Sequence, residues 1–429
     1  MCKLIIKNIG PVKNIDMSVN KVTFLLGPQS SGKSTIAKVL CHCQWIEKRC
    51  YTNFEEESTK FIEGTNFVDG FVEYYRFEGY FRTDSYIRYE GNYIELEYQE
   101  KKLTIKKNGK TTYEYPKLCY VPAERNLVAA IPNLRKYNDT NDLILYFMYD
   151  WFEARDYLKK LDLEKIVERQ VKYEYIASRN SELILDGNES EIELKNASSG
   201  LQSVVPLMMV STYILQDIYR RYKPLSSEQM LQLSKATEVV KRVTEKINAY
   251  IKEQEEKGEV GELRIEVDEA KNNPILRAIL ERDPAVQDLL SSIKKEFFYK
   301  RSDIYIEEPE QNLFPDAQQR YVYWLMKQIK EPTKQHSAFV TTHSPYVLFA
   351  LNNCLMGGLA GGKLSEAEKA GCLSKESWIG PDLVTVYEIH DGELLGIQEK
   401  SGLLMQNYLN RSYGKVNAEF MTLLEYYED

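Results

Sequence analysis

The sequence has few of the residues that build disulfide scaffolds, flexible tails or membrane spans. Its 429 residues include 7 Cys, 14 Pro and 22 Gly, and the cysteines follow no framework spacing. This content excludes a disulfide-rich secreted domain and fits a protein of the reducing cytosol. The longest apolar stretch, at 204–215, is about half of the ~20 residues that a membrane helix needs, and the first residues contain no secretory signal. These absences predict a cytoplasmic protein with no membrane contact.

Neither sign of charge dominates the chain. Lys and Arg number 56 and Asp and Glu number 64, which leaves a formal charge of -8. This mild excess of acid argues against a protein that coats nucleic acid by bulk charge, and it leaves a local basic patch open. The hydrophobic content of 43% and the length indicate a globular protein with two or three domain-sized parts.

Strand-like and helix-like segments alternate along the chain. An apolar run at 22–26 has the character of a buried strand and precedes a helical segment at about 34–48. From about 65 to 120, Tyr, Phe and Ile alternate with polar residues, which predicts an antiparallel β lobe with a hairpin turn at Asn108-Gly109. The other predicted elements are strands on either side of Gly10-Pro11, a helical segment at about 140–170, hairpins at 182–194 and 385–398, strands at 303–306 and 338–342, and a closing helix. The alternation predicts an α/β nucleotide-binding core.

A charged helical stretch separates two parts of this core. Its apolar seam advances by steps of 3 and 4 residues, as in a coiled coil, and lasts under three heptads. The seam consists of Leu233, Ala236, Val240, Val243, Ile247 and Tyr250. We therefore predict a helical insertion at 226–298 and a head formed by 1–225 and 299–429.

One motif predicts a phosphate-binding loop. The segment 27–34 fits the pattern GxxxxGK[ST], in which glycines let backbone N–H groups surround an anion. It lies between a predicted strand and a predicted helix, which is the context that a P-loop requires. Lys33 would supply positive charge to the β- and γ-phosphates, and Ser34 a hydroxyl to Mg²⁺. The predicted nucleotide-binding residues are Gly27, Pro28, Gln29, Ser30, Ser31, Gly32, Lys33, Ser34 and Thr35.

Two further motifs follow predicted strands. Glu307 and Glu308 come where a P-loop protein needs one carboxylate for the magnesium ion and another to polarise the attacking water. We assign Glu307 to the metal and Glu308 to catalysis, although two such acids alone are more often a solvated strand end. His343 follows the strand at 338–342 and is a candidate γ-phosphate sensor, although a lone His is usually structural.

A fourth motif, Ser-Ser-Gly-Leu-Gln at 198–202, precedes an apolar helix. Ser199 is a candidate cap for that helix. A helix N-terminus with small hydroxyl residues and a glycine is also suited to hold a phosphate. Cys41-His42-Cys43 with Cys50, by contrast, matches no zinc spacing, and we interpret the segment as part of a helix.

In this order, the four motifs resemble those of the ABC-type ATPase superfamily. Within it, the chain resembles the SMC/RecF-like branch that includes overcoming-lysogenization-defect (OLD) proteins and bacterial antiphage AAA-type ATPases. The segments 7–15 and 120–125 also resemble that branch, and 226–298 lies outside the resemblance. The resemblance implies a P-loop ABC-type ATPase head that binds ATP and Mg²⁺. It also implies that Ser199, Gly200 and Gln202 of one subunit close over the nucleotide of another, in a homodimer or higher homo-oligomer.

The chain departs from the family pattern at three places. Glu307 stands where Asp is commoner, and Leu201 replaces the second glycine of the Ser-Gly loop. The Gln loop has no clear counterpart, and Glu124 and Arg125 are the candidates for its position. After His343 we find no carboxylate set of the kind that binds metals in the Toprim nuclease domain of OLD proteins.

Several functions stay open at this point. An ATP-hydrolysing switch, acting as a sensor or scaffold, would control a separate effector protein in antiphage defence, with a nuclease among the candidate effectors. A RecF-like DNA repair ATPase would contact DNA through lysine-rich patches, which a solvated hairpin and a helix end also explain. A transporter ATPase subunit shares the four motifs, but the soluble branch fits them better. The patches are Lys101, Lys102, Lys106, Lys107 and Lys110, and Lys294, Lys295, Lys300 and Arg301.

Overall fold

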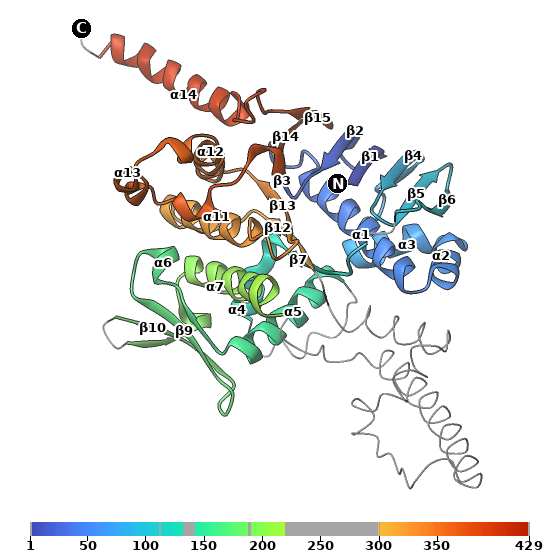
Figure 1. Ribbon diagram of the computed structural model, residues 1–429, viewed down its shortest axis with the longest axis horizontal. Helices are drawn as coiled ribbons and strands as arrows, with labels where there is room; N and C mark the ends of the chain where they lie inside the picture. The colour runs from blue at the N-terminus through green and yellow to red at the C-terminus, as the bar shows by residue number, and fades with distance from the viewer. Residues whose placement is uncertain are drawn as a thin grey trace, which may run out of the picture. The chain divides into compact units, whose positions relative to one another are not determined.

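The computed structural model describes residues 2–110, 113–131, 142–187, 190–218, 299 and 301–427 (Figure 1). The chain divides into two compact units, one formed by Met1–Tyr219 with Lys300–Asp429 and the other by Arg220–Tyr299. Every element named below belongs to the first unit. The helical insertion predicted at 226–298, with its apolar seam, lies outside the described residues.

An eleven-stranded sheet forms the centre of the first unit, in the order β6-β5-β4-β1-β2-β15-β14-β3-β13-β12-β7. Its strands are β1 (Cys2–Ile9), β2 (Val12–Val19), β3 (Val22–Leu26), β4 (Phe81–Glu90), β5 (Ile94–Gln99), β6 (Lys102–Lys107), β7 (Pro116–Val121), β12 (Arg301–Glu307), β13 (Ser337–Thr342), β14 (Val384–His390) and β15 (Glu393–Gly396). From β14 to β7 neighbouring strands are parallel, whereas β6, β5, β4, β1 and β2 form an antiparallel lobe. The predicted α/β class with an antiparallel lobe is confirmed.

Helices cover the parallel part of the sheet. The helices are α1 (Lys33–Thr52), α2 (Phe54–Ile62), α3 (Asn66–Tyr75), α4 (Leu127–Ala130), α5 (Leu143–Leu158), α6 (Glu164–Val167), α7 (Ser199–Thr212), α11 (Pro315–Ile329), α12 (Pro345–Ala360), α13 (Glu366–Gly371) and α14 (Tyr408–Glu425). Figure 1 shows α1, α2 and α3 on one side of the central strands and α11 and α12 on the other. Among the described residues, no helix combines the length and apolar character that crossing a bilayer requires.

The burial of the central strands explains their composition. All five residues of β3 are buried, and in both β12 and β13 every residue after the first is buried. Strands covered by helices on both faces are expected to consist of near-continuous apolar runs. In the antiparallel lobe, β5 instead alternates buried Ile94, Leu96 and Tyr98 with more exposed residues, because only one of its faces meets the core.

A second, smaller sheet has the order β11-β10-β9-β8. Its strands are β8 (Lys160–Asp162), β9 (Val171–Ile176), β10 (Ser181–Asp186) and β11 (Glu191–Glu193). The hairpin predicted at 182–194 is confirmed as the β10–β11 pair. The helix predicted over about 140–170 is only partly correct, because α5 ends at Leu158, the next residue Lys159 has a φ of 57°, and β8 begins at Lys160.

The N-terminal boundary of the predicted β lobe, at about 65, is wrong. Residues 66–75 form α3, and the lobe begins at β4. The aromatic residues that suggested alternation are Phe67, Phe71 and Tyr75, which recur every four residues and are all buried. A spacing of four places side chains on one face of a helix, so these rings pack into the core as a helical stripe.

The hairpin turn predicted at Asn108-Gly109 is also wrong. The strand that follows, β7, pairs with β12 in parallel and not with β6. The tight hairpin in this region joins β5 to β6 at Glu100 and Lys101, which have φ values of 51° and 62°. Positive φ at both central residues is what a two-residue hairpin of this kind needs, and non-glycine residues supply it here.

One buried carboxylate joins α1 to the antiparallel lobe. Glu47 of α1 is 1% exposed and accepts hydrogen bonds from Tyr89 Oη at 2.6 Å, Tyr93 N at 2.6 Å and Ile94 N at 3.2 Å. Burial raises the pKa of Glu47, and these hydrogen bonds oppose that rise. Glu47 therefore fixes the helix that follows the P-loop motif to β4 and to the start of β5, and both oxygens of its carboxylate accept hydrogen bonds.

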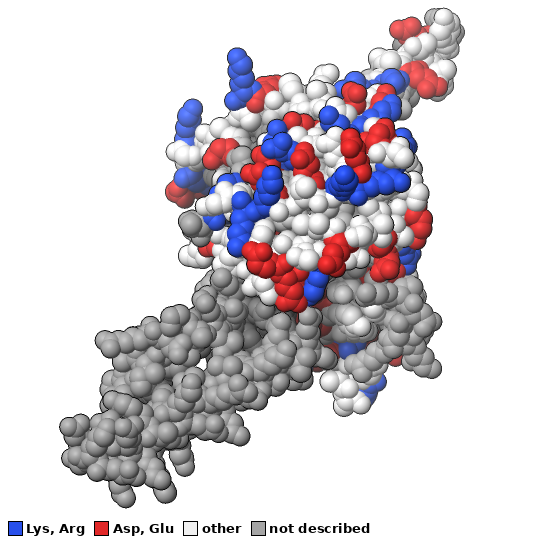
Figure 2. Space-filling view, turned by 90° about the vertical axis from the view of Figure 1, so that its right-hand side faces the viewer, with Lys and Arg blue, Asp and Glu red and all other residues white. Residues whose placement is uncertain are grey.

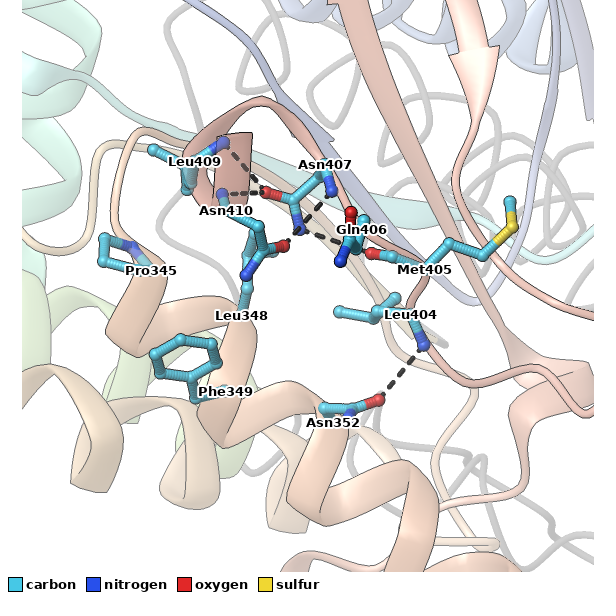
Figure 3. Close-up of a pocket in the computed structure, with 10 residues that line it drawn as sticks. All are labelled: Pro345, Leu348, Phe349, Asn352, Leu404, Met405, Gln406, Asn407, Leu409 and Asn410. Carbon is cyan, nitrogen blue, oxygen red and sulfur yellow. Dashed lines mark hydrogen bonds between the residues drawn. The ribbon is translucent and has the colours of Figure 1, made fainter. Parts of the chain in front are cut away.

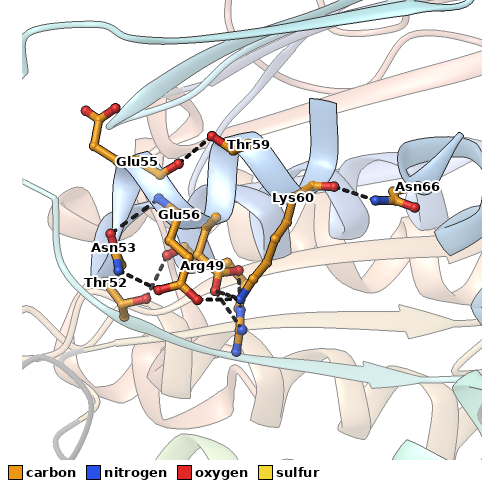
Figure 4. A network of polar contacts seen from close by, with 9 residues as sticks. Arg49, Thr52, Asn53, Glu55, Glu56, Thr59, Lys60 and Asn66 are labelled. Carbon is orange, nitrogen blue, oxygen red and sulfur yellow. Dashed lines mark hydrogen bonds and ion pairs between the residues drawn. The ribbon is translucent and has the colours of Figure 1, made fainter. Parts of the chain in front are cut away.

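A polar network fixes the junction of α1 and α2 (Figure 4). Asn53 caps α2 by accepting from Glu56 N, and Arg49 makes two 2.9 Å hydrogen bonds to the Glu57 carboxylate. Lys60 pairs with Glu56 at 2.7 Å and with Glu57 at 3.3 Å. The bidentate Arg49–Glu57 pair determines the direction in which α2 leaves α1.

We expect Glu47→Ala to lower the free energy of unfolding by about 3 kcal/mol, because it leaves buried donors without an acceptor. Glu47→Gln retains a carbonyl oxygen and an N–H donor, so its loss should be about 1 kcal/mol. Urea unfolding followed by circular dichroism measures both. Glu55→Ala, an exposed change on α2, is the control and should stay within about 0.5 kcal/mol of the parent. Equal stability of the Ala and Gln variants would contradict this account.

Candidate functional site

Three of the four predicted motifs lie at one edge of the sheet. Leu26 at the end of β3 is opposite Thr342 of β13, and Thr341 is opposite Glu307 of β12. Because these strands are parallel neighbours, their carboxyl ends meet at the same edge. The P-loop, the two acids and His343 each follow one of these strand ends.

Two glycines permit the path of the P-loop. A Cβ on Gly27 would lie 2.5 Å from Ile389 Cγ2 and 2.6 Å from Ile389 O, so β14 leaves no room for a side chain there. Gly32 has a φ of 106°, and a Cβ on it would lie 2.8 Å from Val12 Cγ2. The loop therefore runs close to two strands, in a conformation that a glycine adopts readily.

Lys33 lies folded against the loop. Its Nζ donates to Gly27 O at 3.0 Å and to Pro28 O at 2.8 Å. Burial lowers the pKa of Lys33 to about 8, while nearby carboxylates, chiefly that of Glu308, act in the opposite direction. A lysine ammonium is thus held at the loop and lies within the field of the acids across the site.

The other P-loop residues differ in exposure. Pro28, Gln29 and Ser30 are exposed, Ser31 and Ser34 are half-buried, and Thr35 is buried in α1. The Ser31 hydroxyl has no hydrogen-bond partner among the described residues, although its oxygen is buried. The loop thus offers backbone N–H groups, the Lys33 ammonium and an unpaired Ser31 hydroxyl, and no side chain projects from it at Gly27 or Gly32. A nucleotide phosphate fits such a loop.

Glu307 is buried at the end of β12. Its Oε1 accepts a hydrogen bond from the Tyr120 hydroxyl of β7, and the side chain is 6% exposed. Together with the Ser34 hydroxyl it offers hard oxygen ligands, the kind that Mg²⁺ prefers. Within the described ranges no group of three or more His, Cys, Asp and Glu residues could hold a metal. The site fits a magnesium ion that takes its remaining ligands from phosphates and water.

Glu308 points to His343. Its Oε1 lies 3.1 Å from His343 Nε2, and the hydrogen bond to His343 is the main cause that lowers the pKa of Glu308. Glu308 N donates to Thr341 O at 2.9 Å, and its φ of 44° is left-handed. The backbone turns sharply at this residue, and the turn directs the half-buried carboxylate across the strand end.

A third carboxylate, that of Glu310, completes this edge, and the sequence motifs did not assign it a role. Glu310 Oε1 accepts from His343 N at 2.5 Å, and burial raises the pKa of Glu310. Thus Glu308 contacts the ring of His343 and Glu310 contacts its backbone. The sequence signal for Glu310 was its position in the Pro-Glu-Gln-Asn-Leu-Phe-Pro segment directly after the acids. A polar residue so close to a strand end is positioned to contact the neighbouring strand.

Arg125 lies beneath the acids. The residue is fully buried, and its Nη1 and Nη2 donate to Glu307 O at 2.9 Å and to Glu308 O at 2.8 Å. Burial lowers the pKa of Arg125 to about 10, and carboxylates of the site oppose this. Glu124, the other candidate for the Gln loop, is exposed. Arg125 therefore positions the backbone of both acids.

The Ser-Ser-Gly motif begins α7, but the cap is Ser198 and not Ser199. Ser198 Oγ accepts from Leu201 N, while Ser199 is exposed. A Cβ on Gly200 would lie 3.0 Å from Asn312 O, in the loop after the acids. The Gln202 amide donates to Lys195 O at 2.8 Å and to Leu194 O. Among the described residues, no hydrogen bond joins this motif to the P-loop.

The cysteine-rich segment of α1 is structural. Cys41, Cys43 and Cys50 are buried. His42 packs against Phe71 with the rings tilted and their centroids 4.1 Å apart, and burial lowers the pKa of His42 to about 3. A neutral imidazole among aromatic rings belongs to the core, as the helical interpretation expected.

The lysines of β6 do not form a uniform basic surface. Lys106 is opposite Glu95 of β5, Lys107 lies over the Phe54 ring, and Lys110 Nζ donates to Gly91 O. Figure 2 shows basic and acidic groups interleaved over this side of the molecule. Arg301 of the second patch is buried in part and pairs with Asp303 at 3.0 Å; the lysines of that patch lie outside the described residues.

No protein-family profile and no curated protein matches the chain. Among solved structures, the SMC head domain from Thermotoga maritima is 11% identical, with a TM-score of 0.37 over 92% of this chain and 98% of that one. The Smc head domain with an extended coiled coil, bound to the C-terminal domain of ScpA from Pyrococcus furiosus, is 8% identical, with a TM-score of 0.35 over 100% of both chains. The recombination mediator RecF is 12% identical, with a TM-score of 0.31 over 92% of this chain and 97% of that one. Because these TM-scores are below 0.5, the roles of the site residues rest on the geometry of this chain alone.

We expect Arg125→Lys to lower the free energy of unfolding by about 2 kcal/mol, because one ammonium cannot reach both carbonyl oxygens. Arg125→Ala should cost more, since both buried carbonyls then lose their donor. Urea unfolding of the full chain measures both losses. The matched control is Arg88→Lys, an exposed arginine paired with Glu90, for which we expect less than about 0.5 kcal/mol. A loss for Arg125→Lys no larger than that of the control would contradict the positioning role.

Proposed function

We propose that the protein is an ATP-binding and ATP-hydrolysing molecular switch. The observation that carries this proposal is the meeting of the P-loop, Glu307, Glu308 and His343 at the carboxyl edge of three adjacent parallel strands. A phosphate cradle beside one buried and one half-buried carboxylate is the arrangement that phosphoryl transfer to water requires.

Each residue has a defined role in this proposal. Lys33 leaves the carbonyls of the loop and binds the β- and γ-phosphates, while the loop N–H groups bind the remaining oxygens. Ser34 and Glu307 would hold Mg²⁺, which would supply positive charge to neutralise the phosphates. Glu308 accepts a hydrogen bond from the attacking water and orients it, and His343 both positions Glu308 and contacts the γ-phosphate.

The second part of the proposal is a composite site. Ser199, Gly200 and Gln202 would act on the nucleotide bound to the P-loop of a second subunit, in a homodimer closed by ATP and opened by hydrolysis. The exposure of Ser199, and the absence of hydrogen bonds from this motif to its own P-loop among the described residues, support an action in trans. ATP then drives the switch through its different affinities for the open and closed states.

For the biological output, we propose control of a separate effector protein in antiphage defence. The support is the resemblance of the motif set to that of OLD-like and antiphage ATPases. Interleaved charges around the β6 lysines favour a protein partner over DNA as the main ligand. Phage challenge of cells carrying the chain with its neighbouring genes tests this: protection that survives both loss of the neighbours and Glu308→Gln would refute it.

We expect Glu308→Gln to reduce ATP turnover at least ~100-fold while ATP binding persists, because a neutral amide polarises the attacking water far less than a carboxylate does. Lys33→Ala should weaken ATP binding itself by about tenfold or more through the missing charge. Phosphate release and fluorescent-nucleotide titration separate the two effects. Normal turnover by Glu308→Gln would refute its catalytic role.

Mixing two inactive variants tests the composite site. Lys33→Ala disables the P-loop, and Ser199→Arg should block the surface that closes over the other subunit's nucleotide. A mixed dimer has one interface with both defects and one with neither, so an equal mixture should recover roughly a quarter of the parent turnover. If each site lay within one chain, mixing would recover nothing.

A further inference from the structure

The helix α14 is held firmly at its first turn. Asn407 caps it by accepting from Leu409 N and Asn410 N, and the Asn410 side chain accepts from Asn407 N. The buried Glu388 of β14 accepts from Tyr408 N at 3.0 Å and from Arg411 Nη2 at 2.5 Å. These contacts fix the direction of α14 relative to the central sheet.

Beyond that turn, α14 presents an apolar stripe to solvent. None of its 18 residues is buried, and Figure 1 shows it extending away from the other described elements. The stripe consists of Tyr413, Val416, Phe420 and Leu423 of α14 and of Tyr427, two residues beyond its end, which are 73%, 67%, 58%, 64% and 86% exposed. They advance by steps of 3, 4, 3 and 4, the spacing of a helix that packs against another helix. A helix of this length gains most of its stability from such packing, so the stripe points to a partner.

A pocket lies at the base of the same helix, between α12 and the segment 404–410 (Figure 3). Its volume is about 180 Å³. Leu348, Phe349 and Leu404 supply apolar walls, while the amides of Asn352 and Asn407 line it as well. Apolar walls with a few amide groups suit a phenol ring, which has an apolar body and a hydroxyl.

We propose that α14 pairs in antiparallel fashion with α14 of a second copy, so that Tyr427 of each copy enters the pocket of the other. The tyrosine and the pocket lie at opposite ends of one helix, about 27 Å long at 1.5 Å per residue. A chain therefore cannot bring them together alone, whereas antiparallel pairing places each tyrosine at the partner's pocket.

The available area is adequate for a stable dimer. Tyr413, Phe420 and Tyr427 of both copies provide six rings, and an aromatic side chain buries about 150–250 Å². Their burial alone approaches the ~1,200 Å² at the lower end of stable interfaces. The two-fold relation makes every contact occur twice.

Cross-linking tests the pairing directly, on the full chain without nucleotide. Tyr427→Cys and Leu404→Cys are introduced into separate preparations in a Cys372→Ser background, since the other described cysteines are buried. We expect a disulfide-linked dimer when the two preparations are mixed and oxidised, and none with either alone. A mixture that stays monomeric under oxidising conditions overturns the proposal.

Sedimentation velocity gives an independent test. The parent chain should be dimeric without nucleotide, and Phe420→Glu should weaken the dimer at least tenfold, because it places a charge in the stripe. Ala418→Glu, on the opposite face of α14, is the matched control and should remain dimeric. Circular dichroism verifies that both variants fold. A monomeric parent, or a helix that binds only a different protein, overturns the proposal.

The same measurements separate this dimer from the ATP-driven one. Lys33→Ala abolishes the nucleotide switch, but it should sediment as the parent does and form the same cross-link. Normal turnover by Glu308→Gln with cross-linking intact refutes the catalytic role of Glu308 and leaves the α14 pairing standing. Failure of the cross-link with normal ATP turnover removes the pairing and leaves the proposed switch standing.

Discussion

The buried guanidinium of Arg125 is the contact on which the geometry of the site depends. It joins the segment just after β7 to the backbone carbonyls of Glu307, at the end of β12, and of Glu308, the next residue, with both hydrogen bonds under 3 Å. The chain turns into a left-handed conformation at Glu308, which is costly for a residue with a side chain, so neighbouring contacts must hold it there. Arg125 and the hydrogen bond from Glu308 N to Thr341 O provide that restraint. The glutamate carboxylate consequently reaches His343 on the next strand.

From His343 a continuous set of contacts leads to the surface. Ser344 follows it directly and caps α12, and Pro345, in the first turn of α12, lines the pocket beside α14. A shift of the strand end at His343 would thus move the wall of that pocket. If nucleotide binding displaces His343, the pocket in the proposed α14 interface would change shape, because Pro345 lies two residues after His343 and lines that pocket. Coupling between the nucleotide site and the α14 pocket would require two conformations of this turn, with different affinities for nucleotide.

The sequence predicted features that one contiguous segment encodes, and it missed features that depend on residues far apart in the chain. The strand and helix on either side of the P-loop motif, and the strands before the acids and His343, were predicted correctly, because each is a contiguous pattern of glycines or buried apolar residues. Arg125 and Glu310 were assigned no such role, since each acts through a partner far away in sequence. Asn108-Gly109 misled because its turn propensity is local, while β7 pairs with β12, nearly 200 residues away. The aromatic residues of α3 were assigned to the β lobe for a related reason. Phe67, Phe71 and Tyr75 have helical spacing, but the alternating sequence that follows them placed the predicted start of the lobe too early.

The sequence by itself determined that the chain has an α/β core with a loop of the P-loop pattern between a strand and a helix, because period, glycine placement and the order of motifs are properties of the chain alone. It also determined which residue types stand at the strand ends. Only the tertiary structure decided which of them meet: parallel pairing of β3, β13 and β12 brings Lys33, Glu308 and His343 to one edge. It likewise decided that the stripe of α14 is exposed while equally apolar residues elsewhere are buried. Burial and proximity depend on how distant segments pack, and no local pattern contains that information.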